Sequence, residues 1–157
     1  MNISVKSHTA LLWLLPFSLS ELTCALKIML THLPPSGRPV AGRVRSPRLR
    51  PALELALLDD ADMAELNISS LHSPGPTNIL AFPSAGLGWM ALSVETVLRE
   101  ADIYKEEKSF YALRMLAHGL AHLRGYVHGE EMDELSLRAA RAAWDYFKNE
   151  GLLPCLT

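Results

Sequence analysis

Apolar residues in this chain recur at helical spacing in some stretches and form unbroken runs in others. Ser18 and Glu21 form a capping box, and the apolar residues after it recur every three or four positions. This pattern predicts a first helix from about residue 18 to residue 32. A second amphipathic pattern covers Glu130 to Glu150 and predicts a final helix that lies on the core.

Three apolar runs in the middle of the chain predict buried strands. They are Leu53–Leu58, Thr77–Phe82 and Trp89–Ser93. Pro83 should stop the second strand, and a turn at residues 86–88 should precede the third. After the first strand, either Asp59 or Asp60 can cap a short helix that runs through Leu66.

The remaining segments complete an alternation of strands and helices. Residues 69–76 contain Ser, His, Pro and Gly and are typical of a loop. A helix should begin near Val94, and a long one should run from about Lys105 to Leu123, where Gly125 ends it. The chain therefore belongs to the α+β class (α/β-like), with a small mixed sheet packed with helices, and residues 1–157 should form a single domain.

Composition supports a folded protein and gives no global attraction to polyanions. Hydrophobic residues make up 49% and charged residues 20% of the chain, and the net charge is −2. Residues 34–51 stand apart, because five arginines occur there among prolines and glycines without any acidic residue. This basic Pro/Gly-rich insertion fits a solvated flexible loop at least as well as it fits a phosphate-contacting arm.

The chain carries no pattern that predicts export, membrane insertion or a disulfide framework. The apolar run at residues 10–15 is short, is broken by Pro16 and lacks a cleavage site after it. No apolar stretch approaches the roughly 20 residues that cross a bilayer. Cys24 and Cys155 are far apart and fit reduced thiols. We expect a soluble, cytoplasmic protein without membrane association.

The strongest chemical pattern is a group of three histidines in the window from His118 to His128. His118 and His122 are four residues apart, so both imidazoles project from one face of a helix. Gly125 lets the chain turn back and deliver His128 from a loop. Three such ligands with an open fourth position predict a catalytic metal site that holds one zinc ion.

The identity of residue 119 separates this site from that of the zinc peptidases. Their extended motif, HExxHxxGxxH, places a catalytic glutamate directly after the first histidine. The chain has Gly119 at that position. A peptidase would lack its general base, which favours another class of metal-dependent hydrolase.

Three ordered motifs resemble those of the bacterial YbeY endoribonucleases. The histidine window is similar to the family's HGxLHLxGYDH, and residues 77–83 are similar to TNVLSFP. Residues 57–67, which end in Leu66-Asn67, resemble the segment that links a strand to a helix in the family. The likeness covers residues from about Leu53 to the end of the last helix, and more loosely from Ser18 onward.

The resemblance implies a zinc-dependent, single-strand-specific endoribonuclease with His118, His122 and His128 as metal ligands. It further implies a role in maturing the 3′ end of small-subunit (16S) ribosomal RNA and in ribosome quality control. The expected partners are single-stranded ribosomal RNA, the small ribosomal subunit and its assembly factors. The implied fold is a mixed sheet with helices packed around it.

Three positions depart from the family pattern. Leu71 stands where the family commonly has an arginine thought to face the substrate. Val127 replaces the aspartate of GYDH in the histidine motif, and Trp89 replaces the aspartate of the family's strand motif LGDI. Another cation should then neutralise the phosphate, with Arg124 as the first candidate and Arg114 as the second.

Two acidic residues and two competing functions complete the set of hypotheses. Glu130 and Glu131 could transfer protons. The better interpretation is that they are acidic residues of the first turn of the final helix, where the helix dipole favours negative charge. One competing function is a ribosome-assembly factor with a mainly structural zinc site and little catalysis. The other is a metallopeptidase, which Gly119 disfavours.

Overall fold

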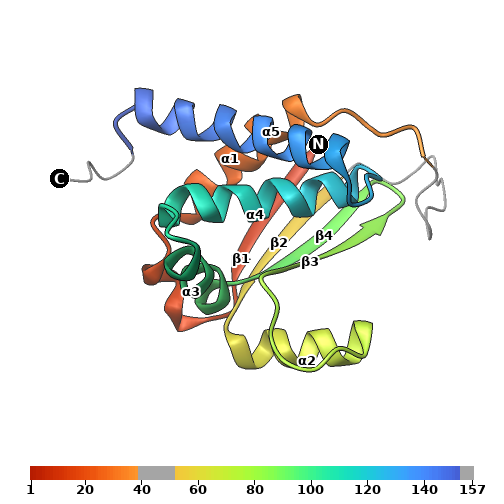
Figure 1. The fold of residues 1–157 in the computed structure, drawn as a ribbon, viewed down its shortest axis with the longest axis vertical. Helices are drawn as coiled ribbons and strands as arrows, with labels where there is room; N and C mark the ends of the chain where they lie inside the picture. The colour runs from red at the N-terminus through yellow and green to blue at the C-terminus, as the bar shows by residue number, and fades with distance from the viewer. Residues whose placement is uncertain (39–51, 153–157) are drawn as a thin grey trace.

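The computed structural model describes residues 1–38 and 52–152, and a four-stranded sheet lies at its centre (Figure 1). The strands are β1 (Asn2–Ser7), β2 (Ala52–Leu58), β3 (Ile79–Ser84) and β4 (Leu87–Ser93). Their order is β1-β2-β4-β3, in which β1 and β4 run parallel to β2 and β3 runs antiparallel to β4. The mixed sheet with helices packed on it confirms the predicted α+β class.

Helices cover the two faces of the sheet unequally (Figure 1). They are α1 (Leu19–His32), α2 (Asp60–Leu71), α3 (Val94–Tyr104), α4 (Lys108–Leu123), α5 (Glu130–Asn149) and the 3-10 helix η1 (Ala10–Leu14). Helix α4 packs on β3 and β4, α1 packs on β1, and α5 lies over α1 and α4 as an outer layer. Helix α2 lies on the opposite face.

The alternation of side chains along β2 explains this arrangement. Leu53, Leu55 and Leu57 are at most 1% exposed and pack in the main core under α1 and α4. Glu54, between them, is exposed, as expected for a strand with one solvated face. The opposite face has only a small buried cluster beneath α2, which consists of Met63, Leu80 and Ala91.

Most predicted elements are confirmed, but α2 is longer than its sequence pattern indicates. Asp59 caps this helix by accepting a hydrogen bond from the backbone N–H of Asp62. The helix continues past Leu66 to Leu71, so the prediction that residues 69–71 belong to a loop is wrong. His72 ends it in the left-handed region at φ 54°, which is a backbone stop that composition does not reveal.

The prediction that Pro83 ends β3 is also wrong. Pro83 lies inside the strand and pairs with Gly88 of β4. Because β3 is an edge strand, the missing N–H of the proline leaves no ladder partner unsatisfied. Gly88 has a φ of 132°, and a Cβ on it would lie 2.1 Å from the Phe82 carbonyl oxygen, so this close approach requires glycine.

The start of the long helix also differs from the prediction, and two elements, β1 and η1, were missed. The long helix begins at Lys108 instead of Lys105, because Lys105 is left-handed and Glu107 caps α4 through the N–H of Phe110. Strand β1 was not predicted, although Ile3 and Val5 pack against the main core. The basic insertion predicted at residues 34–51 lies outside the described residues from 39 onward.

Candidate metal centre

The histidine window begins on the face of α4 that looks toward the β3 edge of the sheet. A Cβ on Gly119 would lie 2.7 Å from the Cδ1 of Ile79 and 2.8 Å from the Sδ of Met90. A larger residue at 119 would therefore require the Ile79 and Met90 side chains to move. This contact leaves no space for the glutamate that zinc peptidases have at the same position. The sequence argument drawn from Gly119 thus acquires a packing reason.

A tight reversal after α4 brings the third histidine back beside the other two. Gly125 has a φ of 94°, and its N–H bonds to the carbonyl of His122 at 2.9 Å. The N–H of Tyr126 then bonds to the Ala121 carbonyl at 3.0 Å, and the Tyr126 ring is buried. As predicted, the chain turns at Gly125 to deliver His128.

Ser36, from a segment distant in the sequence, forms hydrogen bonds with the same turn. The backbone N–H of Ser36 bonds to the Arg124 carbonyl at 3.0 Å, and the Ser36 hydroxyl donates to the Gly125 carbonyl at 2.9 Å. The two segments are 89 residues apart in the chain. Carbonyl groups left open at the end of α4 are thereby satisfied.

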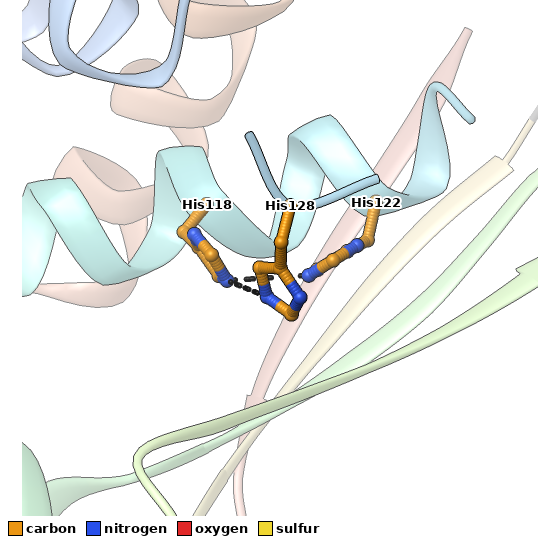
Figure 2. Close-up of side chains that lie close together, drawn as sticks. All are labelled: His118, His122 and His128. Carbon is orange, nitrogen blue, oxygen red and sulfur yellow. Dashed lines mark hydrogen bonds between the residues drawn. The ribbon is translucent and has the colours of Figure 1, made fainter. Parts of the chain in front are cut away.

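The three imidazoles converge on one point (Figure 2). The Nε2 of His118 lies 3.2 Å from that of His122 and 3.3 Å from that of His128. One nitrogen from each of the three rings lies within 4.8 Å of those of the other two. Two nitrogens bound to one tetrahedral zinc ion at about 2.0–2.1 Å are about 3.3 Å apart. The His118–His122 and His118–His128 pairs match this spacing, and three imidazoles are a donor set that zinc accepts.

A backbone carbonyl fixes the orientation of one ligand. The Nδ1 of His122 lies 3.2 Å from the carbonyl oxygen of Tyr126, where a protonated Nδ1 donates a hydrogen bond. That tautomer leaves the lone pair of Nε2 directed at the convergence point. Outer partners of this kind orient metal-binding imidazoles in many proteins.

The surroundings also keep the helical histidines neutral. Burial, and then the neighbouring His122 and His128, lower the pKa of His118 to about 4. Burial and His128 likewise lower the pKa of His122, against the raising effect of the Tyr126 carbonyl. Neutral imidazole is the form that binds a metal ion, so both groups are ready for binding at neutral pH without losing a proton.

A cavity of about 660 Å³ opens in front of the triad. Its other walls come from the end of α2, the loop that follows it and the first half of β3; they include Asn67, Leu71, Pro74, Thr77, Asn78 and Leu80. Hereafter we call this space the triad cavity. Its size exceeds what a single metal ion needs and leaves room for part of a larger ligand.

Two amides hold the walls of the triad cavity in place. The buried Asn67 side chain donates to the Gly75 carbonyl at 2.9 Å and ties the loop after α2 to that helix. The Asn78 amide donates to Glu100 at 2.9 Å, and the Tyr111 hydroxyl donates to the same carboxylate oxygen at 2.8 Å. Burial, and then Glu100, raise the pKa of Tyr111, which keeps this hydroxyl a donor.

Sequence reasoning did not assign site roles to these amides. Asn67 and Asn78 lie in the motifs that carried the family resemblance. Their position in those motifs could have identified them as site residues. Glu100 and Tyr111 lie outside those motifs, and only the packing of α3 against α4 brings them to Asn78. No single-sequence pattern predicts such a contact.

The candidate cations lie away from the triad cavity. The Arg124 guanidinium donates to the Leu30 carbonyl at the end of α1, at 3.4 Å, and does not line the triad cavity. Arg114 forms an ion pair with Glu106 and lines a second cavity, which it shares with His118. The structure thus does not bring Arg124 to the three histidines, and its catalytic role stays a prediction.

The other singled-out residues are readily placed. Glu130 and Glu131 lie in the first turn of α5, as expected of acids that favour a helix start. Leu71 lines the triad cavity and is 59% exposed, whereas Val127 is 60% exposed beside His128. Trp89 belongs to the opposite sheet face, where it stacks on Phe82 at 4.3 Å between ring centroids.

The sequence profile of the family described as Endoribonuclease YbeY matches residues 41–144 of this chain. A curated relative of that name from Oleidesulfovibrio alaskensis is 34% identical over 161 residues, covering 85% of this chain and 88% of the relative. A second, from Lawsonia intracellularis, is 33% identical over 126 residues, with 78% and 84% covered.

One solved structure has the same fold over almost the whole chain. The solution structure of a protein from Thermotoga maritima superimposes with a TM-score of 0.62 and covers 96% of this chain and 94% of that one. The two sequences are 19% identical, so this likeness concerns the fold alone.

Proposed function

This chain belongs to the Endoribonuclease YbeY family, and from that premise we propose that it is a zinc-dependent endoribonuclease specific for single-stranded RNA. The observation that carries the proposal is the convergence of His118, His122 and His128 at the mouth of a cavity. Three imidazoles suit zinc, and they leave a coordination position open for chemistry.

A zinc ion in such a site supplies a Lewis acid for the phosphoryl group and lowers the pKa of bound water to about 7. The protein's own contribution is to fix the three imidazoles before the substrate arrives. Gly119 lets α4 sit tightly on the sheet, and the Tyr126 carbonyl orients His122. Asn67 and Asn78 hold the facing walls, so the cavity keeps its shape.

The proposed substrate is single-stranded ribosomal RNA, and the proposed process is maturation of the 3′ end of the small-subunit RNA together with ribosome quality control. The partners would be the small ribosomal subunit and its assembly factors, in the cytoplasm. Among the described residues, no helix combines the length and the apolar character that a bilayer span requires.

A second candidate function is a ribosome-assembly factor in which the metal is mainly structural. The observation that favours it is Leu71, because this apolar side chain lines the triad cavity where the family commonly has an arginine. A peptidase is disfavoured, since residue 119 cannot carry the required glutamate without displacing Ile79 and Met90.

The experiment compares wild type with His118→Ala, with and without a chelator, on a single-stranded ribosomal RNA fragment. His8→Ala serves as the matched control, because His8 is exposed and lies outside the triad. Metal content is measured by mass spectrometry and cleavage by gel electrophoresis. We expect one zinc ion per wild-type and His8→Ala chain, chelator-sensitive cleavage by both, and loss of metal and cleavage in His118→Ala.

Two results would redirect the assignment. Stoichiometric zinc without chelator-sensitive cleavage would refute the nuclease and leave the assembly factor. A wild-type protein that binds no metal under any loading condition would refute both functions.

A further inference from the structure

A second cavity, of about 550 Å³, shares the His118 side chain with the triad cavity. Two rows of side chains face each other across it. Phe110, Arg114 and His118 follow one another at intervals of four residues on α4, and Leu137 and Arg141 do so on α5. We call this space the α4–α5 groove. Among the three predicted metal ligands, His118 lines it.

The two cavities differ in their positive charge. Among the described residues, no lysine or arginine lines the triad cavity, whereas Arg114 and Arg141 both line the α4–α5 groove. A phosphodiester strand carries a negative charge at every nucleotide, and binding proteins neutralise it with such side chains. Of the two cavities, the groove is therefore the one that offers cations to the strand beyond the scissile phosphate.

The two arginines are placed differently. Arg114 is held by its ion pair with Glu106 and lies over the Tyr111 ring, 5.8 Å from its centroid, which leaves further N–H groups of the guanidinium open to the groove. Arg141 is exposed, and within the described residues its guanidinium has no hydrogen-bond or ion-pair partner. The guanidinium of Arg114 is thus held in one place, whereas that of Arg141 is free to change its orientation.

Apolar side chains also line the groove. Phe110 is half-buried, with its ring edge-on to Trp144 at 5.4 Å, and Met115 and Leu137 lie beside it. An aromatic ring next to an arginine pair is the combination with which proteins bind single-stranded nucleic acid, since the ring contacts a base and the cations contact phosphate. Glu106 and Asp133 also line the groove, so its acidic and basic side chains balance, which disfavours binding of a phosphate that has no base attached.

We propose that the α4–α5 groove binds the nucleotide next to the scissile phosphate, with its phosphate at Arg114 and Arg141 and its base against Phe110. The proposal rests on the proposed function, because an endonuclease substrate continues on both sides of the cut. His118 lines both cavities, so a strand whose phosphate lies at the triad can continue past His118 into the groove.

The test measures binding of a fluorescein-labelled single-stranded RNA by anisotropy in the presence of chelator, so that metal and cleavage do not contribute. Arg141→Ala is compared with Arg138→Ala, which removes the same charge from an exposed position on α5 outside the groove. We expect Arg141→Ala to bind about tenfold more weakly, with a salt dependence reduced by about 0.7 in log–log slope. Arg138→Ala should bind like wild type.

A second variant tests the base contact. Phe110→Leu keeps an apolar side chain in the groove but removes the ring, and RNA affinity should fall several-fold while the salt dependence stays as in wild type. Thermal melting of each variant controls for folding. Equal affinities of Arg141→Ala and Arg138→Ala would overturn the proposal, as would a wild type that does not bind the RNA.

Failure of the subsite and failure of the nuclease assignment give different results. If metal-loaded wild type cleaves the RNA but Arg141→Ala and Arg138→Ala bind equally, the subsite is refuted and the nuclease stands. If wild type binds the RNA through Arg141 but does not cleave it when loaded with zinc, the groove stands as an RNA-binding surface and the nuclease is refuted.

Discussion

Helix α4 and the loop that follows it support the same metal site in different ways. The helix presents His118 and His122 from a surface pressed against the sheet, with Ala117, Leu120 and Ala121 buried on its other sides. The loop presents His128 from an exposed stretch, residues 127–129, and the Gly125 turn, the Tyr126 backbone hydrogen bonds and the Ser36 hydrogen bonds hold this loop in place. Two ligands therefore depend on core packing, and the third depends on backbone conformation.

This difference shows how rigidity is distributed in the site. Displacing the helix would require repacking the core, which is costly because protein interiors are close-packed. Displacing the loop requires a change in a few dihedral angles. Mutations in the two supports should consequently act on different quantities: global stability for the helix, and metal affinity for the loop.

The strongest test of the helical support is Gly119→Glu, which installs the residue that zinc peptidases carry. The new side chain would meet Ile79 and Met90 and would bring a carboxylate against a buried apolar surface. We expect a loss of more than about 3 kcal/mol in the free energy of unfolding. Urea unfolding of the chelated protein measures it.

Gly119→Ala is the graded control for that experiment. Overpacking should cost about 1–3 kcal/mol, partly offset by the roughly 1 kcal/mol gain in helix propensity. A Gly119→Glu protein as stable as wild type would show that α4 does not depend on its close contact with the sheet.

The corresponding test of the loop support is Gly125→Ala. At a φ of 94° an alanine is strained by about 1–2 kcal/mol, and relief of that strain would move His128 and the Tyr126 carbonyl. We expect zinc affinity to fall about tenfold, as for loss of an outer-shell partner. Competition with a chromophoric chelator measures this affinity.

Gly151→Ala is the matched control, because Gly151 also has a positive φ, of 66°, but lies beyond the end of α5. It should cost similar stability and leave zinc affinity unchanged. Equal zinc affinities for Gly125→Ala and wild type would remove the distinction between the two supports.

The same division explains what could be predicted from the sequence. The four-residue spacing of His118 and His122 fixes a common helix face, and Gly125 marks the reversal, so the triad was predictable from local rules alone. The capping box at Ser18 likewise gave the first helix to within a residue. Local chemistry decided each of these features.

Features that depend on tertiary contacts could not be predicted in this way. Pro83 continues β3 only because that strand lies at the edge of the sheet, and β1 is a strand because it pairs with β2. The contacts of Ser36 with the turn and of Glu100 with Asn78 join segments that no short motif links. Arg124 was a candidate by sequence proximity, but its side chain reaches α1 instead.

A smaller effect is expected on the pH dependence of stability, through the buried His118 side chain. The pKa of His118 is lowered from 6.5 to about 4, so in that interval the unfolded chain binds a proton that the folded chain does not. Stability is therefore complete above about pH 6.5 and is lost as the pH falls toward 4. The melting temperature of the chelated protein should drop by a few degrees over this range.

His118→Gln is the reference for this measurement, because carboxylates that titrate in the same range contribute equally to both proteins. The difference in melting temperature between wild type and variant should change with pH only between about 6.5 and 4. A difference that stays constant would mean that burial of His118 does not resist its protonation.

The smallest expected effect comes from Val127→Asp, which restores the family's aspartate in the loop. Val127 is 60% exposed, so a carboxylate there remains hydrated and its attraction for a bound cation is screened by salt. Zinc affinity should rise less than about tenfold at low ionic strength, and the gain should disappear as salt is added, whereas stability without metal should change by less than about 0.5 kcal/mol. A large gain that persists at high salt would instead mean that the aspartate orders the loop. Zinc affinity in the wild type would then be limited by how firmly the loop holds His128, as expected for a ligand whose position depends on backbone conformation.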